Sequence, residues 1–438
     1  MRSMRIAAIA AIFLGWHADG ALAAEVLELV DFQLVDGTGA QARRVERLVA
    51  SDGRVVAMDG VGTVPQAGPG DRWLRVDLDG AFVMPGLVET HAHVARFPDA
   101  HAQATRILEA AARGGVTAVR DMAGDARTLA ELERARVAGE LVIPVVQASA
   151  VMGGPDVFAN GPLADMAPGR EPGEAAWARR IDAGTDVRLA VAEAKGAGVG
   201  QVKLYGDLDV ARAQALIDEA HAQGLLAAAH ATVFPAGPGA LVDAGIDSLA
   251  HAPYLVWEGA AAVPDDFRKR IDGPWSTVPP DHPQLVSLYR RMAERGVFLD
   301  ATLYVYKAMN SYPGHPGAPW ADAAFRWAAQ ATRLARAAGV RVTVGTDWFE
   351  PGEGEFLPHT HEELALLVEA AGFTPMQALV AGTRDGAAAL GMGASRGTVE
   401  VGKFADLLVL DADPLADIRN TQRIRFTVVE GRIVDPPR

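Results

Sequence analysis

The sequence predicts an α/β protein in which a (β/α)8 TIM-like barrel, residues 81–391, is joined to a small β-sandwich domain formed by residues 24–80 and 392–438. Three observations favour this fold. Short apolar segments alternate with helical segments eight times in the middle of the chain. The helical connections between them are long enough to imply that the strands are parallel. Before and after this region, the chain has short strand-like segments without helices between them. Eight parallel strands favour a closed barrel over an open sheet.

Residues 1–23 are typical of an export signal. Arg2 and Arg5 precede an apolar stretch that ends at Trp16, and Ala21-Leu22-Ala23 has the small-residue pattern of a cleavage site. The alternative is a membrane anchor, but the apolar stretch is shorter than the about 20 residues that cross a bilayer. We therefore expect cleavage just after this pattern, a periplasmic or secreted protein, and no stable membrane insertion after cleavage.

The composition restricts the class of protein and its partners. Half of the residues (50%) are hydrophobic and 22% are charged, which is typical of a globular protein with a large core. The formal net charge of −14 without basic clusters argues against nucleic acid or an anionic membrane surface as a partner, but it does not identify the small-molecule substrate. The chain has no cysteine, so a metal site must use histidine and carboxylate ligands. The sequence is compatible with a homo-oligomer.

The elements are expected in the following order. Residues 25–80 alternate apolar and polar positions between turn signals such as "DGTG" and "SDGR", which predicts short antiparallel strands. The tail repeats this pattern, and we expect its strands to join the N-terminal ones. The long connection 257–281 is a candidate lid over a functional site. The first of the eight barrel strands is predicted over 81–88 and continues toward His91. The other seven are predicted over 116–121, 141–150, 201–205, 225–231, 246–252, 297–304 and 340–347. The tail strands are predicted over 396–402, 405–412 and 424–434.

The ends of the barrel strands carry the candidate ligands. His91 and His93 are two residues apart, so their side chains point to the same side of the first strand, at the carboxyl end where barrel active sites lie. Strands four, five, six and eight end in other groups that bind metals or act as bases. These are Lys203, His230, His251 and Asp347. The sequence therefore predicts a metal site at one rim of the barrel.

Lys203 ends an apolar strand, and burial should favour its neutral amine. A neutral amine can react with carbon dioxide to form a carbamate, and that anion can bridge two cations. The alternative is an ordinary lysine that turns to solvent or pairs with Asp207 or Asp209. The five neighbouring candidate ligands favour the carbamate.

These motifs resemble the amidohydrolase superfamily, in particular its imidazolonepropionase-like and metal-dependent dipeptidase (prolidase-like) branch. The resemblance is carried by "MPGLVETHAHV", the strand-end residues, the "GTD" that ends at Asp347 and the closing "GTVEVGKFADLLVLDADPL". It implies one or two divalent metals, with zinc first and manganese, cobalt or iron as alternatives. It further implies that one metal is held by His91, His93 and Asp347, that the second is held by His230 and His251, and that carboxylated Lys203 bridges them.

Two positions depart from this family. The residue after His251 is Ala252, where relatives often have Gly, and the motif after the third strand also differs. Peptidase relatives usually carry Gly-Gly-His after the third strand, whereas this chain has Gly153-Gly154-Pro155, so a histidine that contacts substrate is absent.

The expected activity is hydrolysis of a small amide, such as a dipeptide or an N-acyl amino acid, by metal-activated hydroxide, with an ester or a lactone as a further option. Asp347 would accept the proton and return it to the leaving group, and Tyr205 would donate a hydrogen bond to the substrate or be a packed aromatic residue. His359 and His361 are either supporting residues of the site or surface residues. Two alternatives remain: a mono-metal hydrolase or deaminase for a cyclic amide, and a non-catalytic metal-binding barrel.

Overall fold

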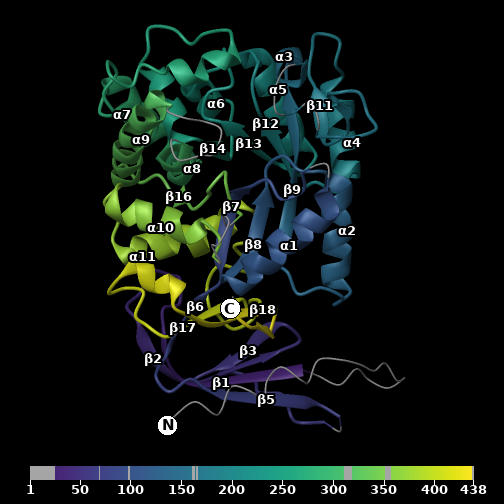
Figure 1. Ribbon diagram of the computed structural model, residues 1–438, viewed down its shortest axis with the longest axis vertical. Coiled ribbons are helices and arrows are strands. Elements are labelled where there is room, and N and C mark those ends of the chain that lie inside the picture. The colour runs from purple at the N-terminus through teal and green to yellow at the C-terminus, as the bar shows by residue number, and fades with distance from the viewer. Residues whose placement is uncertain are drawn as a thin grey trace.

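The computed structural model describes residues 25–68, 70–96, 99–159, 163, 166–309, 318–350 and 357–436 (Figure 1). The predicted export signal, residues 1–23, lies outside these ranges. The described chain has two parts: a barrel surrounded by helices and, at one end of it, a smaller sheet in which N-terminal and C-terminal strands lie together (Figure 1). The predicted fold class is confirmed.

The barrel is a ring of eight parallel strands. Each strand pairs in parallel with the next along the chain. The backbone nitrogen of Thr90 donates a hydrogen bond of 2.9 Å to the carbonyl of Val344, which joins the last strand to the first. The strands are β7 (Leu87–Ala92), β8 (Val116–Asp121), β9 (Val145–Gly153), β12 (Gln201–Leu204), β13 (Leu226–His230), β14 (Ser248–Ala250), β15 (Phe298–Asp300) and β16 (Val342–Thr343).

Helices cover the outside of the barrel by burying one apolar face each. In α7 (Pro283–Arg295) the buried positions Leu285, Leu288, Tyr289 and Met292 follow the spacing of one helix face. The other helices are α1 (Ala100–Arg113), α2 (Ala126–Val137), α3 (Pro155–Ala159), α4 (Val187–Gly196), α5 (Val210–Ala222), α6 (Pro238–Asp243), α8 (Leu303–Ala308), α9 (Pro319–Ala337), α10 (Thr360–Glu369), α11 (Pro375–Val380) and α12 (Gly386–Ala389). The short helical turns are η1 (Ala252–Glu258), η2 (Phe267–Asp272), η4 (Ala381–Asp385) and η5 (Ile418–Gln422).

The smaller sheet has its own hydrophobic core, which includes Leu29, Phe32 and Leu48. It is mixed rather than purely antiparallel, because β5 and β6 both run parallel to β1. Its strands are β1 (Glu25–Leu34), β2 (Arg43–Ser51), β3 (Arg54–Met58), β4 (Val61–Gly62), β5 (Arg72–Asp77), β6 (Phe82–Pro85), β17 (Leu407–Leu410), β18 (Ile424–Val429) and β19 (Arg432–Val434). Two short strands, β10 (Glu174–Ala175) and β11 (Ala178–Arg180), extend the barrel sheet beside β9.

Two strand predictions were wrong. The segment 81–88 is not one barrel strand: β6 pairs with β1 and β17 in the smaller sheet, and the barrel strand β7 begins only after Gly86. Gly86 packs so closely that a Cβ there would lie 2.3 Å from the side chain of Thr117, and its nitrogen donates a hydrogen bond to the carbonyl of Asp406. Residues 396–402 form turns instead of a strand, since Gly397 and Gly402 have φ values of 89° and 96°.

The connection 257–281 is ordered against the carboxyl end of the barrel. It contains η2, and the indole nitrogen of Trp275 donates a hydrogen bond of 2.9 Å to the carbonyl of Pro253. None of the helices in the described ranges combines the length and apolar character that crossing a membrane requires.

Shortening Leu48 should destabilise the protein. Leu48 is fully buried between Leu29 and Met58 on the neighbouring strands, so Leu48→Ala leaves a cavity that should lower the free energy of unfolding by about 2–5 kcal/mol. Val61→Ala in the same sheet, at a side chain that is 64% exposed, should change it by less than about 0.5 kcal/mol. Urea unfolding measures both, and equal effects would contradict this packing.

Candidate metal centre

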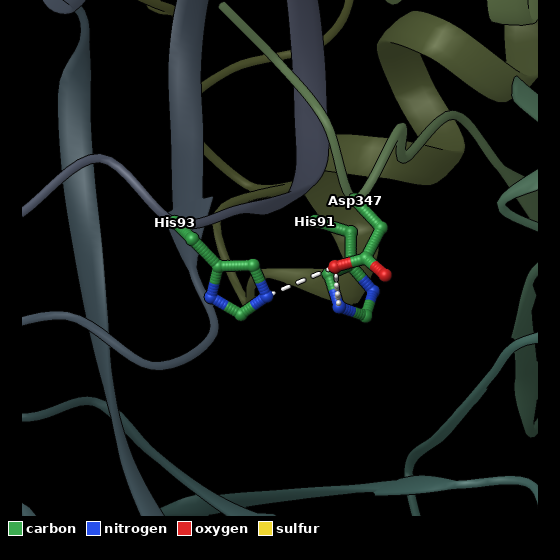
Figure 2. A group of neighbouring side chains, drawn as sticks. All are labelled: His91, His93 and Asp347. Atoms are coloured by element: carbon green, nitrogen blue, oxygen red, sulfur yellow. Dashed lines mark hydrogen bonds and ion pairs between the residues drawn. The ribbon is translucent and has the colours of Figure 1, made fainter. Parts of the chain in front are cut away.

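Three candidate ligands meet at the carboxyl ends of β7 and β16. The metal-binding atoms of His91, His93 and Asp347 all lie within 4.8 Å of one another. Oδ1 of Asp347 lies 2.9 Å from Nε2 of His93 and 3.4 Å from Nε2 of His91, so one carboxylate oxygen sits between two imidazoles (Figure 2). Two nitrogens and a carboxylate oxygen aimed at one point form a donor set that suits a divalent metal.

Two further imidazoles continue this cluster across the barrel. The ring centroid of His251 lies 4.9 Å from that of His91 and 4.6 Å from that of His230. Burial is the largest cause that lowers the pKa of His91, and it holds the pKa values of His230 and His251 well below their usual value. The three rings are therefore neutral near pH 7, which is the form that binds metals.

Lys203 lies in the same buried region, on β12. Its Nζ is buried and has no hydrogen-bond partner within the described parts of the chain. Burial, assisted by the charge of Arg120, lowers the pKa of Lys203 to about 7, although Asp300 and Asp347 oppose the shift. The neutral amine is therefore well populated near neutral pH.

Neither carboxylate that was considered as an ion-pair partner of Lys203 serves that role. Asp207 accepts a hydrogen bond from the backbone of Asp156, and Asp209 caps α5 and pairs with Arg212. A buried amine without a partner fits conversion to a carbamate, because that anion would be satisfied by bound cations.

Asp347 keeps its charge in this setting. Burial alone would raise the pKa of the Asp347 carboxyl, but the imidazoles of His91, His93 and His251 outweigh burial and lower it. The backbone here is unusual, since His251, Thr302 and Asp347 have left-handed φ values of 68°, 51° and 56°. Such conformations are costly for non-glycine residues and concentrate at functional sites.

Sequence reasoning missed Asp300 and Arg120, which lie behind the ligands. Oδ2 of Asp300, at the end of β15, accepts a hydrogen bond of 2.8 Å from Nδ1 of His91. This bond places the proton on Nδ1 and leaves the lone pair of Nε2 directed at the cluster. Arg120 is fully buried in the barrel, lies 3.8 Å from the same Asp300 oxygen, and donates to the carbonyl of Thr90. Asp300 ends a strand just as the other candidates do, so the strand-end rule could have found it.

Glu89 was also missed. It is fully buried, and one of its oxygens accepts hydrogen bonds from the backbone nitrogens of His91 (3.0 Å) and Thr346 (2.8 Å). Its other oxygen accepts a hydrogen bond from the hydroxyl of Thr360. Glu89 thus joins the end of β7 to the segment that carries Asp347. Its position two residues before His91, on the same side of the strand, was a signal in the sequence.

Tyr205 lies beside the imidazole cluster, with its ring centroid 4.3 Å from that of His230. Burial raises the pKa of its phenol, so the hydroxyl stays protonated and can donate. His359 lies farther along the chain, where its ring is 4.3 Å from that of Tyr304. His361 is neither a site residue nor a surface residue: its Nε2 lies 2.8 Å from the carbonyl of Gly114, and its ring is buried.

A cavity of about 310 Å³ lies at the junction of the smaller sheet and α2, lined by residues that include Arg136, Phe404 and Arg432. None of the six candidate ligands lines it. Its main charges compensate each other, since Arg136 pairs with both Glu133 and Glu430. The chemistry therefore belongs to the barrel rim.

Replacing Asp300 should weaken metal binding. Asp300→Asn removes the negative charge that orients His91, so affinity for zinc should fall by about 10–100-fold in a chelator competition. Asp247→Asn is a matched control, because Asp247 contacts Nε2 of His221 at 2.9 Å on the outside of the barrel. Unchanged affinity in Asp300→Asn, with an unchanged unfolding temperature, would contradict this role.

The comparisons with known proteins agree with the geometry. No curated protein matches the sequence, but the Amidohydrolase family matches it over residues 82–434. A prolidase candidate from Bifidobacterium longum has a similar structure, with 27% identity, coverage of 94% of this chain and 96% of that chain, and a TM-score of 0.69.

Two more distant structures share the fold. They are a Xaa-Pro dipeptidase with bound methionine (19% identity, 94% and 100% coverage, TM-score 0.70) and A. niger ochratoxinase (22% identity, 95% and 96% coverage, TM-score 0.71). The family match covers most of the chain and includes every candidate ligand. The protein therefore belongs to the amidohydrolase family and is a hydrolase that acts on carbon–nitrogen bonds.

Proposed function

We propose that this protein is an exported, metal-dependent amidohydrolase that hydrolyses a small amide, either a dipeptide or an N-acyl amino acid. One observation carries the proposal: the carboxyl ends of the barrel strands hold neutral imidazoles, one ionised carboxylate and an unpaired buried amine side by side. Burying so many polar groups together is costly unless a ligand satisfies them. Divalent cations would satisfy all of these groups.

The donor set fits two cations better than one. His91, His93 and Asp347 would hold the first, His230 and His251 the second, and Lys203, as a carbamate, would join them. Bound there, the metals would polarise the amide carbonyl and supply hydroxide near neutral pH. Histidine and carboxylate ligands favour zinc, although manganese, cobalt or iron would also be accommodated.

The protein's own residues would then handle the proton and the substrate. Asp347 is ionised and partly exposed, with 23% of its side chain accessible, so it can accept a proton from the attacking water and return it to the leaving amine. The protonated phenol of Tyr205 can donate a hydrogen bond to the carbonyl oxygen as negative charge develops. His91 is held in one orientation by Asp300 throughout.

A second candidate function is a mono-metal hydrolase or deaminase for a cyclic amide. The compactness of the His91, His93 and Asp347 group favours it, since these three residues alone could hold one cation. The unpaired amine of Lys203 favours the two-metal form. Counting metals therefore separates the two candidates.

Lys203 provides the direct test. The wild-type protein should bind about two equivalents of zinc and hydrolyse members of a dipeptide and N-acyl amino acid library. Lys203→Ala should lose metal and at least about 100-fold in turnover, whereas Lys195→Ala, at an exposed lysine, should lose neither. Chelation should abolish turnover, and zinc should restore it.

The alternatives give other results. One equivalent of metal with activity on cyclic amides alone would support the mono-metal enzyme. Tight metal binding without turnover of any amide would support a non-catalytic barrel.

Export is tested separately. Because residues 1–23 have the layout of a cleavable signal, the protein recovered from the periplasm or medium should begin just after Ala23 when its intact mass is measured. Replacing Ala21 and Ala23 by bulky residues should block this cleavage. Recovery of an unprocessed chain from the cytoplasm would contradict export.

A further inference from the structure

The turn η2, in the long connection after β14, lies against Tyr205, whose ring borders the imidazole cluster. Its first residue, Phe267, is buried, and the ring centroid lies 5.8 Å from that of Tyr205. Gly206, which follows Tyr205 in the chain, leaves room for this contact, because a Cβ at Gly206 would lie 3.1 Å from the Phe267 ring. The turn is therefore packed directly on the end of β12.

Arg270 is the one basic residue of this turn without an acidic partner in the described parts of the chain. Its neighbours are paired: Arg268 with Asp266 at 2.8 Å and Lys269 with Asp272 at 3.2 Å. The guanidinium carbon of Arg270 instead lies 4.3 Å from the centroid of the Phe267 ring. The aromatic face and a side-chain hydrogen bond to Tyr254 hold the guanidinium in place, and its remaining donors are available to a ligand.

The charge of Arg270 is directed toward the site. It adds to burial in lowering the pKa of His230, and it opposes the effect of burial on the pKa values of the Tyr205 and Tyr254 phenols. Tyr254 is itself in ring contact with both His230 and His251, at 5.9 Å and 5.3 Å. Arg270 thus faces the same space as the imidazole cluster.

We propose that Arg270 binds a carboxylate of the substrate, so that the site selects amides that carry a free carboxylate close to the scissile bond. A partly buried guanidinium without an acidic partner among the described residues gains most from an anion with two oxygens, which it can bind through two parallel hydrogen bonds. The inference rests on the proposed amide hydrolysis and assigns to Arg270 the recognition of the free carboxylate that dipeptides and N-acyl amino acids carry.

A second cation, Arg96, also acts on Tyr205 but is a weaker candidate. Arg96 is exposed, and its effect is the smallest of the causes that shift the pKa of Tyr205. Exposed charges are screened by water and salt, so Arg96 should contribute little to selection.

Ligand binding tests this role without requiring turnover. Calorimetry on zinc-loaded protein should show that N-benzoylglycine binds at least about 10-fold more tightly than its carboxamide, because the neutral amide forfeits the charged hydrogen bonds. Arg270→Gln should abolish this preference. Arg268→Gln, a neighbouring arginine that is already paired, should retain it, and so should Arg96→Gln.

The kinetic counterpart uses any acid substrate from the amide library and its carboxamide. Arg270→Gln should lower kcat/KM for the acid by about 10–100-fold, mainly through KM, and change that for the carboxamide by less than about 3-fold. Arg270→Lys should recover part of the loss, which separates lost charge from lost packing against Phe267.

The outcomes are distinct. Equal binding of acid and carboxamide to the wild type, or loss of the preference in Arg96→Gln alone, would overturn the role of Arg270. A preference that depends on Arg270 without turnover of any amide would uphold the carboxylate site and refute the proposed hydrolysis.

Discussion

Burial of ionisable groups at the carboxyl ends of the barrel strands is the constraint on which this site depends. Removal from water lowers the pKa of His230 and His251, so their rings present lone pairs, and it lowers the pKa of Lys203 to about 7. The imidazoles of His91, His93 and His251 favour the ionised form of Asp347. One environment therefore produces neutral nitrogen donors next to a fixed negative charge, the combination that divalent cations require and that water alone would not maintain.

Residues that lie behind the candidate ligands hold them in position. Asp300 fixes the His91 ring, Arg120 lies close to Asp300 within the barrel, and Glu89 joins the backbone of two strand ends. The left-handed backbone at His251 costs about 1–3 kcal/mol and persists only where the surrounding structure determines it. The continuous hydrogen-bonded ring of strands, with its helices, supplies that support, so rigidity of the barrel and precision of the site have the same origin.

The two sides of the site differ in chemistry. On the strand side the groups suit cations and the activation of a carbonyl. On the loop side, η2 and the residues after β14 contribute aromatic rings and the guanidinium of Arg270. An amide with an adjacent carboxylate would match both sides. Family membership accounts for the first side, whereas the second side belongs to a connection whose length and sequence are not set by the barrel.

The sequence by itself determined the barrel and the rim on which the candidate ligands lie, because strand periodicity and parallel pairing bring the ends of apolar segments to one face. It did not reveal that β6 leaves the barrel, which depends on pairing with β17, more than 300 positions away. Asp300 and Glu89 carried signals that were overlooked, but the pairing of Arg120 and the position of Arg270 were decided by tertiary structure alone. Local patterns report neighbours within a few residues, whereas the groups that share one desolvated space are fixed only when distant segments pack.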